Sequence, residues 1–162
     1  MVHRVLTTIL LLAALAGAQT TIYIVRHAEK DTTPGVTDPG LTPKGERRSR
    51  ALLRTLRSVS LDAVFATQYR RTRATVAPSA RRRGVKIESY DAARSGTFAK
   101  RLGRRKGTYL VAGHSNTVPA MLAALGVKNP PKLTESDHDD LFVVVATPDG
   151  TIVFQHLHYG EP

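Results

Sequence analysis

Short β-branched runs that alternate with amphipathic segments set the fold class of this chain. Runs with strand character lie at residues 21–25, 61–66, 85–90 and 108–112, and helix-forming segments lie at 42–57, 69–82, 97–105 and 116–125. Two further strands, at 141–146 and 151–156, flank Pro148-Asp149-Gly150, which is a hairpin signal. We therefore predict an α/β three-layer sandwich, with a mostly parallel central sheet flanked by helices and a C-terminal antiparallel hairpin.

The first 18 residues have the layout of a secretory signal peptide. A short positive start is followed by an apolar run at 5–15 and by Ala16-Gly17-Ala18, a small-residue cleavage site. The apolar run is shorter than the ~20 residues that span a bilayer. We expect cleavage after Ala18, no transmembrane span afterwards, and one domain over 19–162. The protein is then exported, periplasmic or secreted, with an uncleaved N-terminal anchor as one alternative and a buried first element of a cytosolic domain as the other.

Composition narrows the classes of partner. The 24 Lys and Arg outnumber the 13 Asp and Glu, and the net charge of +11 favours anionic partners such as phosphorylated molecules, nucleic acid or an anionic membrane face. With no cysteine, a disulfide framework, thiolate metal sites and a cysteine nucleophile are excluded. The hydrophobic share of 41 % excludes a disordered chain.

Basic and imidazole side chains follow three of the four parallel strands. Arg26 and His27 come after the first, Arg71 lies just beyond the second, and His114 follows the fourth. Ligands of open parallel sheets bind beyond the carboxyl ends of the strands. Each residue alone is weak evidence for a binding site. A lone buried histidine is usually structural, and the arginines near Arg71 are also typical of the solvated face of a basic helix. Their joint placement predicts an anion site at this edge.

Four segments carry a family resemblance: RHAEK, LTPKGERRSRALL, ATQYRRTRAT and GHSNTVPAML. In this order they resemble the motifs of the histidine phosphatase superfamily, in its phosphoglycerate mutase-like branch and close to the small phosphohistidine phosphatases. The resemblance runs from about Ile22 to Val145.

The resemblance implies a role for each matching residue. His27 would be the nucleophile that forms a transient phosphohistidine, and Arg26, Arg71 and His114 would hold the phosphoryl oxygens. Arg71 is favoured over Arg70 because the family arginine stands four positions after a small polar residue, here Thr67. Several convergent cationic donors could replace a metal, so we expect neither a metal nor another cofactor.

Other candidate residues keep two interpretations each. Thr42 matches a position near the family site, and a plain helix cap is the alternative. Ser115 and Asn116 either begin a helix or contact phosphate. Glu88 and Asp91 are the candidates for the acid that protonates the leaving group, although neither stands in an acid motif and Asp91 also suits a turn or a cap.

The expected function is hydrolysis of phosphate esters or phosphoramidates. The interval from Asp91 to Lys106 is too short for a helical lid, which predicts a shallow, open site and argues against mutase activity. The partner would be a phosphorylated small molecule or a phosphoprotein. Both a protein phosphohistidine and a broad range of phosphomonoesters remain open as substrates.

Three rival functions follow from the residues. A basic nucleic-acid-binding protein is one, although aromatics form only 6 % of the chain and Trp is absent, which disfavours base stacking. A phosphate-binding relative without catalysis is the second. The third is a metal site at His156 and His158, whose i, i+2 spacing places both on one face of a strand. No further ligand is evident in the sequence, so the last pair is interpreted as a surface pair.

Overall fold

The computed structural model describes residues 19–161, so the predicted signal peptide lies outside the described residues. The strands are β1 (Thr20–Arg26), β2 (Ala63–Ala66), β3 (Ile87–Ser89), β4 (Gly107–Gly113), β5 (Asp140–Ala146) and β6 (Ile152–His158). The helices are α2 (Pro43–Thr55), α3 (Arg70–Arg83), α4 (Ser95–Leu102) and α5 (Thr117–Ala124), with a short 3-10 turn, η1 (Ala92–Arg94). The predicted strands and helices are all present, with β3 shorter than expected.

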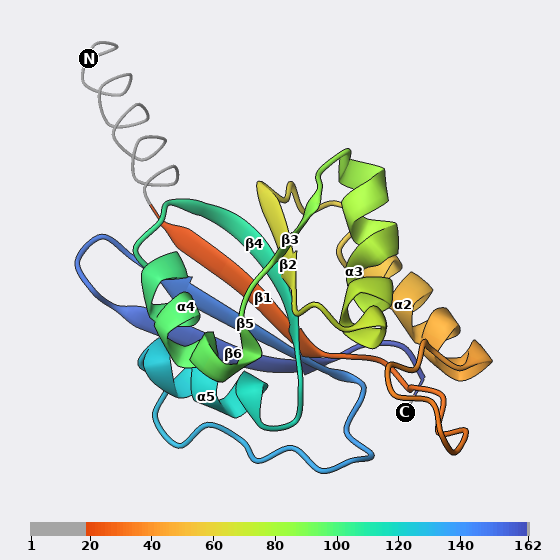
Figure 1. The fold of residues 1–162 in the computed structure, drawn as a ribbon. Helices are drawn as coiled ribbons and strands as arrows, with labels where there is room; N and C mark the ends of the chain where they lie inside the picture. The colour runs from red at the N-terminus through yellow and green to blue at the C-terminus, as the bar shows by residue number, and fades with distance from the viewer. Residues whose placement is uncertain (1–18, 162) are drawn as a thin grey trace, which may run out of the picture.

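The sheet has the order β3-β2-β4-β1-β5-β6 (Figure 1). The strands from β3 to β1 are parallel to one another, whereas β5 and β6 form the antiparallel hairpin. The chain therefore passes over the place of β4 on its way from β1 to β2, and fills it later. This reversal of strand order makes the carboxyl ends of β1 and β4 neighbours, where a doubly wound sheet places its ligand.

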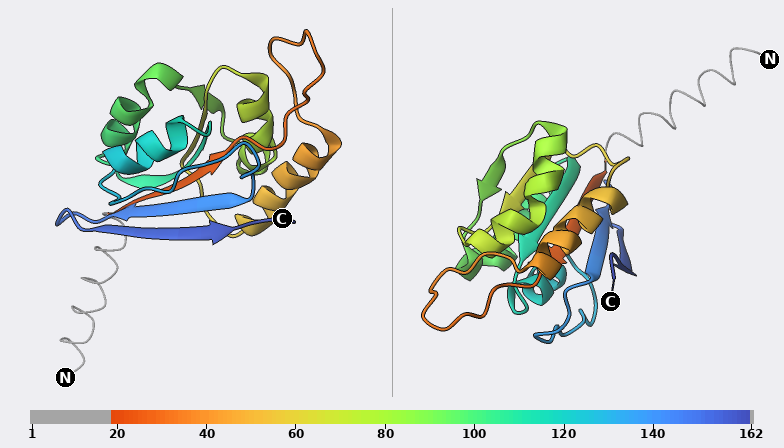
Figure 2. Two further views of the ribbon diagram at one scale, coloured as in Figure 1. Left: turned by 90° about the horizontal axis from the view of Figure 1, so that it is seen from below. Right: turned by 90° about the vertical axis from the view of Figure 1, so that its right-hand side faces the viewer.

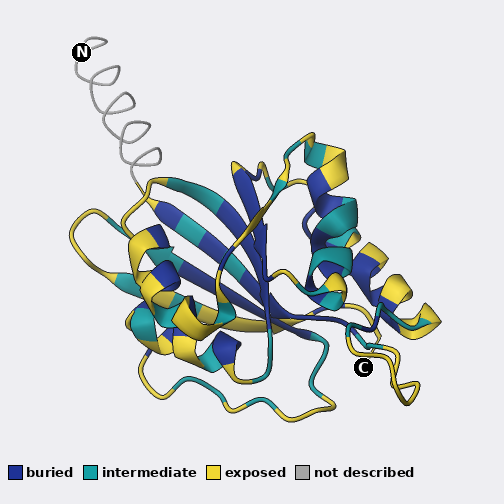
Figure 3. Ribbon diagram, viewed as in Figure 1, coloured by how far each residue is buried: buried dark blue, intermediate teal, exposed yellow. Residues whose placement is uncertain are grey.

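Helices cover both faces of the sheet, which confirms the predicted three layers (Figure 2). One core joins the sheet to α4 and α5, with Phe98, Met121 and Leu122 buried against it. The other joins the sheet to α2 and α3 through Leu52 and Val76. Figure 3 shows the buried residues along the central strands and the inner sides of the helices. Residues 19–161 contain no helix with the length and apolar character needed to cross a bilayer.

Pro78 does not end α3, although a proline inside a helix normally breaks or bends it. Its missing N–H would leave the carbonyl of Ala74 without its helical donor. The hydroxyl of Ser49 on α2 lies 3.0 Å from that oxygen and 2.8 Å from the carbonyl of Thr75, so it supplies a substitute donor. A contact between helices thus allows α3 to continue past the proline to Arg83.

The start of α2 packs against the loop that follows β1. Thr42 caps the helix, because its Oγ1 accepts from the Gly45 N–H at 3.1 Å, and Pro43 occupies the first turn. A Cβ at Gly45 would lie 2.3 Å from the carbonyl oxygen of Glu29, so only glycine permits this approach. Glu29 in turn accepts hydrogen bonds from the guanidinium of Arg48 on α2 at 2.8 to 3.0 Å. The loop after β1 is therefore held rigidly.

Candidate active site

The ends of β1 and β4 bring two histidines together. Arg26 is in register with Gly113, and the His27 N–H donates to the Gly113 carbonyl at 2.9 Å. The rings of His27 and His114 consequently lie 5.4 Å apart between centroids, at 66° to each other. The two imidazoles that sequence analysis placed at one edge of the sheet are thus adjacent.

The His27 side chain is buried and neutral at physiological pH. Its residue is 4 % exposed. Burial is the largest cause that lowers the pKa of His27 to about 3, and the charges of Arg26, His114 and Arg71 act in the same direction, against a hydrogen bond to the backbone of Ala28. Nδ1 lies 2.8 Å from the Ala28 carbonyl, so Nδ1 carries the proton and donates it. Nε2 then carries no proton, and its lone pair can act as a hydrogen-bond acceptor, a base or a nucleophile.

His114 is oriented by the residues that follow β2. Its Nε2 lies 3.0 Å from the hydroxyl of Thr67, which is itself 2.8 Å from the hydroxyl of Thr72. The Tyr69 ring packs edge-on against it at 5.4 Å. Burial and then the charges of Arg71 and Arg26 lower the pKa of His114 to about 4. A bound anion would favour the protonated ring and make it a second cationic donor.

Arg71 stands in the first turn of α3 with its guanidinium carbon 4.5 Å from the centre of the Tyr69 ring. Its side chain is 16 % exposed, and the carboxylate of Asp38 is 3.8 Å from Nη1. The Nε–H of Arg71 is buried and no residue from 19 to 161 accepts it. A buried unpaired donor costs about 1–3 kcal/mol, which an anion would relieve. Arg70 instead lines a groove between α2 and α3, whereas Arg71 lines the cavity over the histidines.

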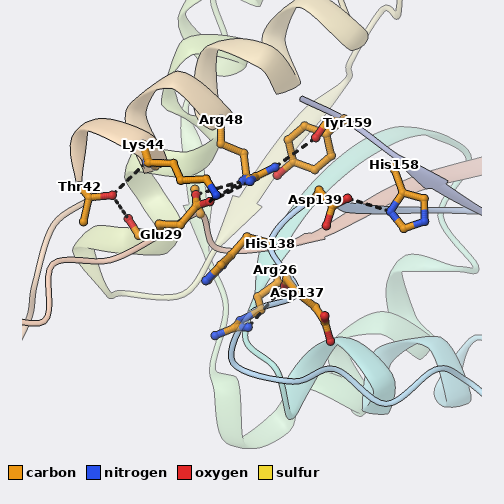
Figure 4. A network of polar contacts seen from close by, with 12 residues as sticks. Arg26, Glu29, Thr42, Lys44, Arg48, Asp137, His138, Asp139, His158 and Tyr159 are labelled. Atoms are coloured by element: carbon orange, nitrogen blue, oxygen red, sulfur yellow. Dashed lines mark hydrogen bonds and ion pairs between the residues drawn. The ribbon is translucent and has the colours of Figure 1, made fainter. Parts of the chain in front are cut away.

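Arg26 occupies a different place from the one its expected role suggests. Its side chain is 1 % exposed, and Nη2 pairs with the carboxylate of Glu135 at 3.0 Å. Nη1 donates to the carbonyl of Thr134 and lies 3.4 Å from that of Asp137. Figure 4 shows Arg26 beside Asp137 and His138. The guanidinium therefore lies behind the cavity wall, held by the segment before β5.

An open cavity of about 370 Å³ lies over the histidines. Its walls are His27, Lys30, Tyr69, Arg71, Ala92, Ala93, His114, Ser115, Asn116, Thr117 and Glu135. Ser115 and Asn116 thus line the cavity directly before α5, which begins at Thr117. Lys30 and Arg71 bring two positive charges to the cavity against the single negative charge of Glu135, so the cavity suits a small anion.

Three other candidates lie away from this cavity, and for Thr42 and Asp91 the structure shows the helix cap that was the alternative interpretation of each. Thr42 serves as the cap of α2 and also donates to the Glu29 carbonyl at 3.3 Å. Glu88 and Asp91 line a separate hollow beside α4. Asp91 caps η1 through the Ala93 N–H, because the chain turns there from β3 towards α4. Neither carboxyl lines the cavity above His27.

The comparisons with known proteins agree with this geometry. Residues 22–95 match the family model described as histidine phosphatase superfamily, branch 1. This part of the chain, a little under half of its length, is therefore similar to the histidine phosphatase superfamily. It contains His27 and Arg71, whereas His114 lies beyond its end. No curated protein matches the sequence.

Solved structures extend the histidine phosphatase fold over most of the chain. The protein histidine phosphatase SixA in complex with tungstate has 18 % identity and a TM-score of 0.68, with 85 % of this chain and 96 % of that chain covered. A mycobacterial glucosyl-3-phosphoglycerate phosphatase has 15 % identity and a TM-score of 0.66, covering 89 % and 100 %. An Entamoeba histolytica phosphoserine phosphatase has 12 % identity and a TM-score of 0.62, covering 88 % and 98 %. At these identities the likeness shows the fold.

Sequence analysis missed two residues at or beside this site. Glu135 lines the cavity and is also 3.2 Å from the Ser115 hydroxyl, and the charge of Arg26 lowers its pKa. His138 places Nδ1 2.9 Å from the His27 carbonyl, with the two rings 5.8 Å apart. Both come from the irregular segment before β5. The polar run LTESDHDD in this segment could have indicated functional side chains, but no periodicity in the sequence links it to the other motifs.

The buried imidazoles make stability depend on pH. The pKa values of about 3 for His27 and about 4 for His114 lie below the unfolded value near 6.5. Between about pH 4 and 6.5 these two histidines are protonated in the unfolded chain but stay neutral in the folded protein. The free energy of unfolding is therefore greatest above pH 6.5 and falls on acidification, by up to about 1.4 kcal/mol per pH unit for each ring.

Thermal unfolding in phosphate-free buffers between pH 7.5 and 4.5 measures this effect. His114→Asn should reduce the pH dependence of the melting temperature, because the variant lacks one histidine whose pKa differs between the folded and unfolded states. If the melting temperatures of the variant and the native protein fall equally with pH across this range, His114 is not held neutral by the fold.

Proposed function

We propose that the chain is a metal-independent phosphatase that hydrolyses phosphate esters or phosphoramidates through a phosphohistidine on His27. One observation carries this proposal: the buried, neutral ring of His27 has a free Nε2 beneath a cavity bounded by Arg71, Lys30 and His114. A neutral nitrogen in a cationic cavity is the arrangement that attack on an anionic phosphorus requires. The histidine phosphatase segment at 22–95 supports the same assignment.

The first step transfers the phosphoryl group to the protein. The Nε2 lone pair of His27 forms a bond to phosphorus while the bond from phosphorus to the leaving group breaks. The Nδ1–H···O contact with Ala28 stabilises the positive charge that develops on the ring. Arg71 and protonated His114 stabilise the negative charge on the phosphoryl oxygens, and the N-terminus of α5 at Ser115 and Asn116 adds to that field.

The second step hydrolyses the phosphohistidine and regenerates His27. Water attacks phosphorus, the bond from phosphorus to Nε2 breaks, and inorganic phosphate leaves with the oxygen of that water. Glu135 is the carboxyl in the cavity wall, and its lowered pKa keeps it ionised in the free protein. It is therefore a poor proton donor. This favours substrates whose leaving group departs without a proton from the protein.

The shape of the site supports a substrate with an accessible phosphoryl group. The cavity is open, and only the short η1 and α4 segments stand between β3 and β4. Proteins with this fold include a protein histidine phosphatase and a glucosyl-3-phosphoglycerate phosphatase, so a phosphoprotein and a phosphorylated small molecule both fit. Mutase activity is disfavoured, because no lid covers the cavity within the described residues.

A substrate panel in the presence of EDTA tests the proposal. The purified protein should hydrolyse para-nitrophenyl phosphate at the same rate with and without the chelator, since no step uses a metal. The panel also contains a phosphohistidine peptide, sugar phosphates, nucleotides and phytate, and the relative kcat/KM values identify the substrate class. Loss of hydrolysis in EDTA that added metal restores would contradict a metal-independent mechanism.

Binding without catalysis is the alternative function, as a nucleic-acid- or phosphate-binding protein. The net charge of +11 supports it, and exposed arginines on α2 and α3 contribute much of that charge. Steeply salt-dependent DNA binding together with no hydrolysis of any panel member would favour this function.

We also propose that the protein is exported. The proposal rests on the sequence of residues 1–18 alone, which has the positive start, apolar run and small-residue site of a signal peptide. Free phosphomonoesters are available to an exported phosphatase. Export therefore favours the small-molecule substrates of the panel over the phosphohistidine peptide.

A further inference from the structure

The sequence analysis left His156 and His158 as a surface pair without a third ligand, and the structure supplies that ligand. Asp140 begins β5 and is in register with His158 on β6. Its Oδ1 lies 2.5 Å from Nε2 of His156 and 3.5 Å from Nδ1 of His158. The three ligand atoms all lie within 4.8 Å of one another.

We propose that Asp140, His156 and His158 form a binding site for a divalent transition-metal ion of the zinc class, separate from the phosphatase cavity. Two imidazole nitrogens and one carboxylate oxygen are a ligand set that zinc accepts, with a fourth position for water or another carboxylate. Bond lengths of about 2.0–2.2 Å place tetrahedral ligand atoms roughly 3.3 Å apart. The observed 2.5 and 3.5 Å need only small side-chain adjustments.

The surroundings of the cluster hold its ligand side chains in place and add negative charge. Asp140 is buried, with its side chain 8 % exposed, so its carboxylate is held in place by the sheet. The ring of His156 packs on Phe142 at 4.6 Å between centroids, which limits its rotamers. Asp139 adds a second carboxylate, with Oδ2 3.0 Å from Nδ1 of His158, as Figure 4 shows. Two carboxylates offset the positive charge of the rest of the chain at this point.

The site is also accessible. The side chains of His156 and His158 are 35 % and 63 % exposed on β6, which is the edge strand of the sheet. An ion can therefore reach the cluster from solvent. Its ligands come from the two strands of one hairpin, so a bound ion would cross-link β5 and β6 at the end remote from their turn.

Zinc titration by isothermal calorimetry, on protein first treated with a chelator, tests this site. The native protein should bind one ion here, and His156→Ala/His158→Ala should weaken that binding by more than about 100-fold, since loss of an outer-shell partner alone costs about 10–100-fold. Asp140→Asn should weaken it as well. Gln155→Ala is the matched control, because Gln155 is exposed on the opposite face of the same strand and should leave binding unchanged.

A second measurement separates this cluster from the histidines of the cavity. Paramagnetic Co²⁺ should broaden amide signals of β5 and β6 in the native protein and in His27→Ala, but not in the double variant. Equal zinc affinity in the native protein and the double variant, or broadening centred on His27 and His114, would overturn the proposal. Melting temperatures measured in chelator verify that each variant remains folded.

Discussion

Replacement of His27 by alanine is expected to lower kcat for para-nitrophenyl phosphate by at least about 10³-fold, because the attacking atom is lost. The imidazole is buried and its proton is held on Nδ1 by the Ala28 carbonyl, which leaves the Nε2 lone pair as the attacking atom. The Nε2 of His114 is already engaged with Thr67 at 3.0 Å. The measurement is steady-state release of para-nitrophenol in EDTA.

A labelled intermediate shows whether His27 itself carries the phosphoryl group. Rapid acid-free quenching of the native protein with a ³²P-labelled substrate should leave label on His27, stable to base and labile to acid, as a phosphoramidate is. The label should be absent from His27→Ala, whose melting temperature confirms that it is folded. Hydrolysis at the native rate by the variant, or label on another residue, would refute the nucleophile assignment.

Substitution of Arg71 by alanine is expected to weaken orthovanadate or phosphate binding by about 10–100-fold, the equivalent of roughly 1.5–3 kcal/mol for a charge-assisted hydrogen bond. The guanidinium stacks on Tyr69, lines the cavity, and has a buried Nε–H that no described residue accepts. The anion supplies the acceptor. The dissociation constant, measured by calorimetry or thermal shift, reports the effect, and kcat/KM should fall with it.

Arg70→Ala is the matched control for this prediction. Arg70 is the preceding residue in the same helix turn with the same charge, but its side chain lines the groove between α2 and α3. Its removal lowers the net charge by the same amount, so any general electrostatic contribution to binding is equal in the two variants. An equal loss of phosphate affinity in both would mean that Arg71 makes no specific contact.

The alternation of strands and helices could be predicted because it depends on local patterns. β-branched runs, the Thr42-Pro43 helix start and the Pro148-Asp149-Gly150 turn each act within a few residues. The same patterns located the carboxyl ends of the strands, and hence His27, Arg71 and His114. The continuation of α3 through Pro78 was not predictable in this way, since its replacement donor, Ser49, is on another helix.

The carboxyl group that lines the cavity was the part of the site that sequence interpretation did not locate. Glu88 and Asp91 were kept as candidates although neither stands in an acid motif, and a turn or a cap was the other interpretation of Asp91. The short β3 and the η1 turn send both side chains towards α4. Glu135 enters the cavity instead, from a segment whose path depends on β5 pairing with β1.

By itself, the sequence determined the element order and the cationic and imidazole character of the site, because these follow from residue types and short spacings. The residue expected to attack phosphorus came from the resemblance to a known family. Tertiary structure alone decided which distant side chains meet. The insertion of β4 between β1 and β2 makes His27 and His114 neighbours, and the register of β5 with β6 brings Asp140 to His156 and His158. Such contacts depend on strand pairing across long stretches of chain, and no local periodicity encodes them.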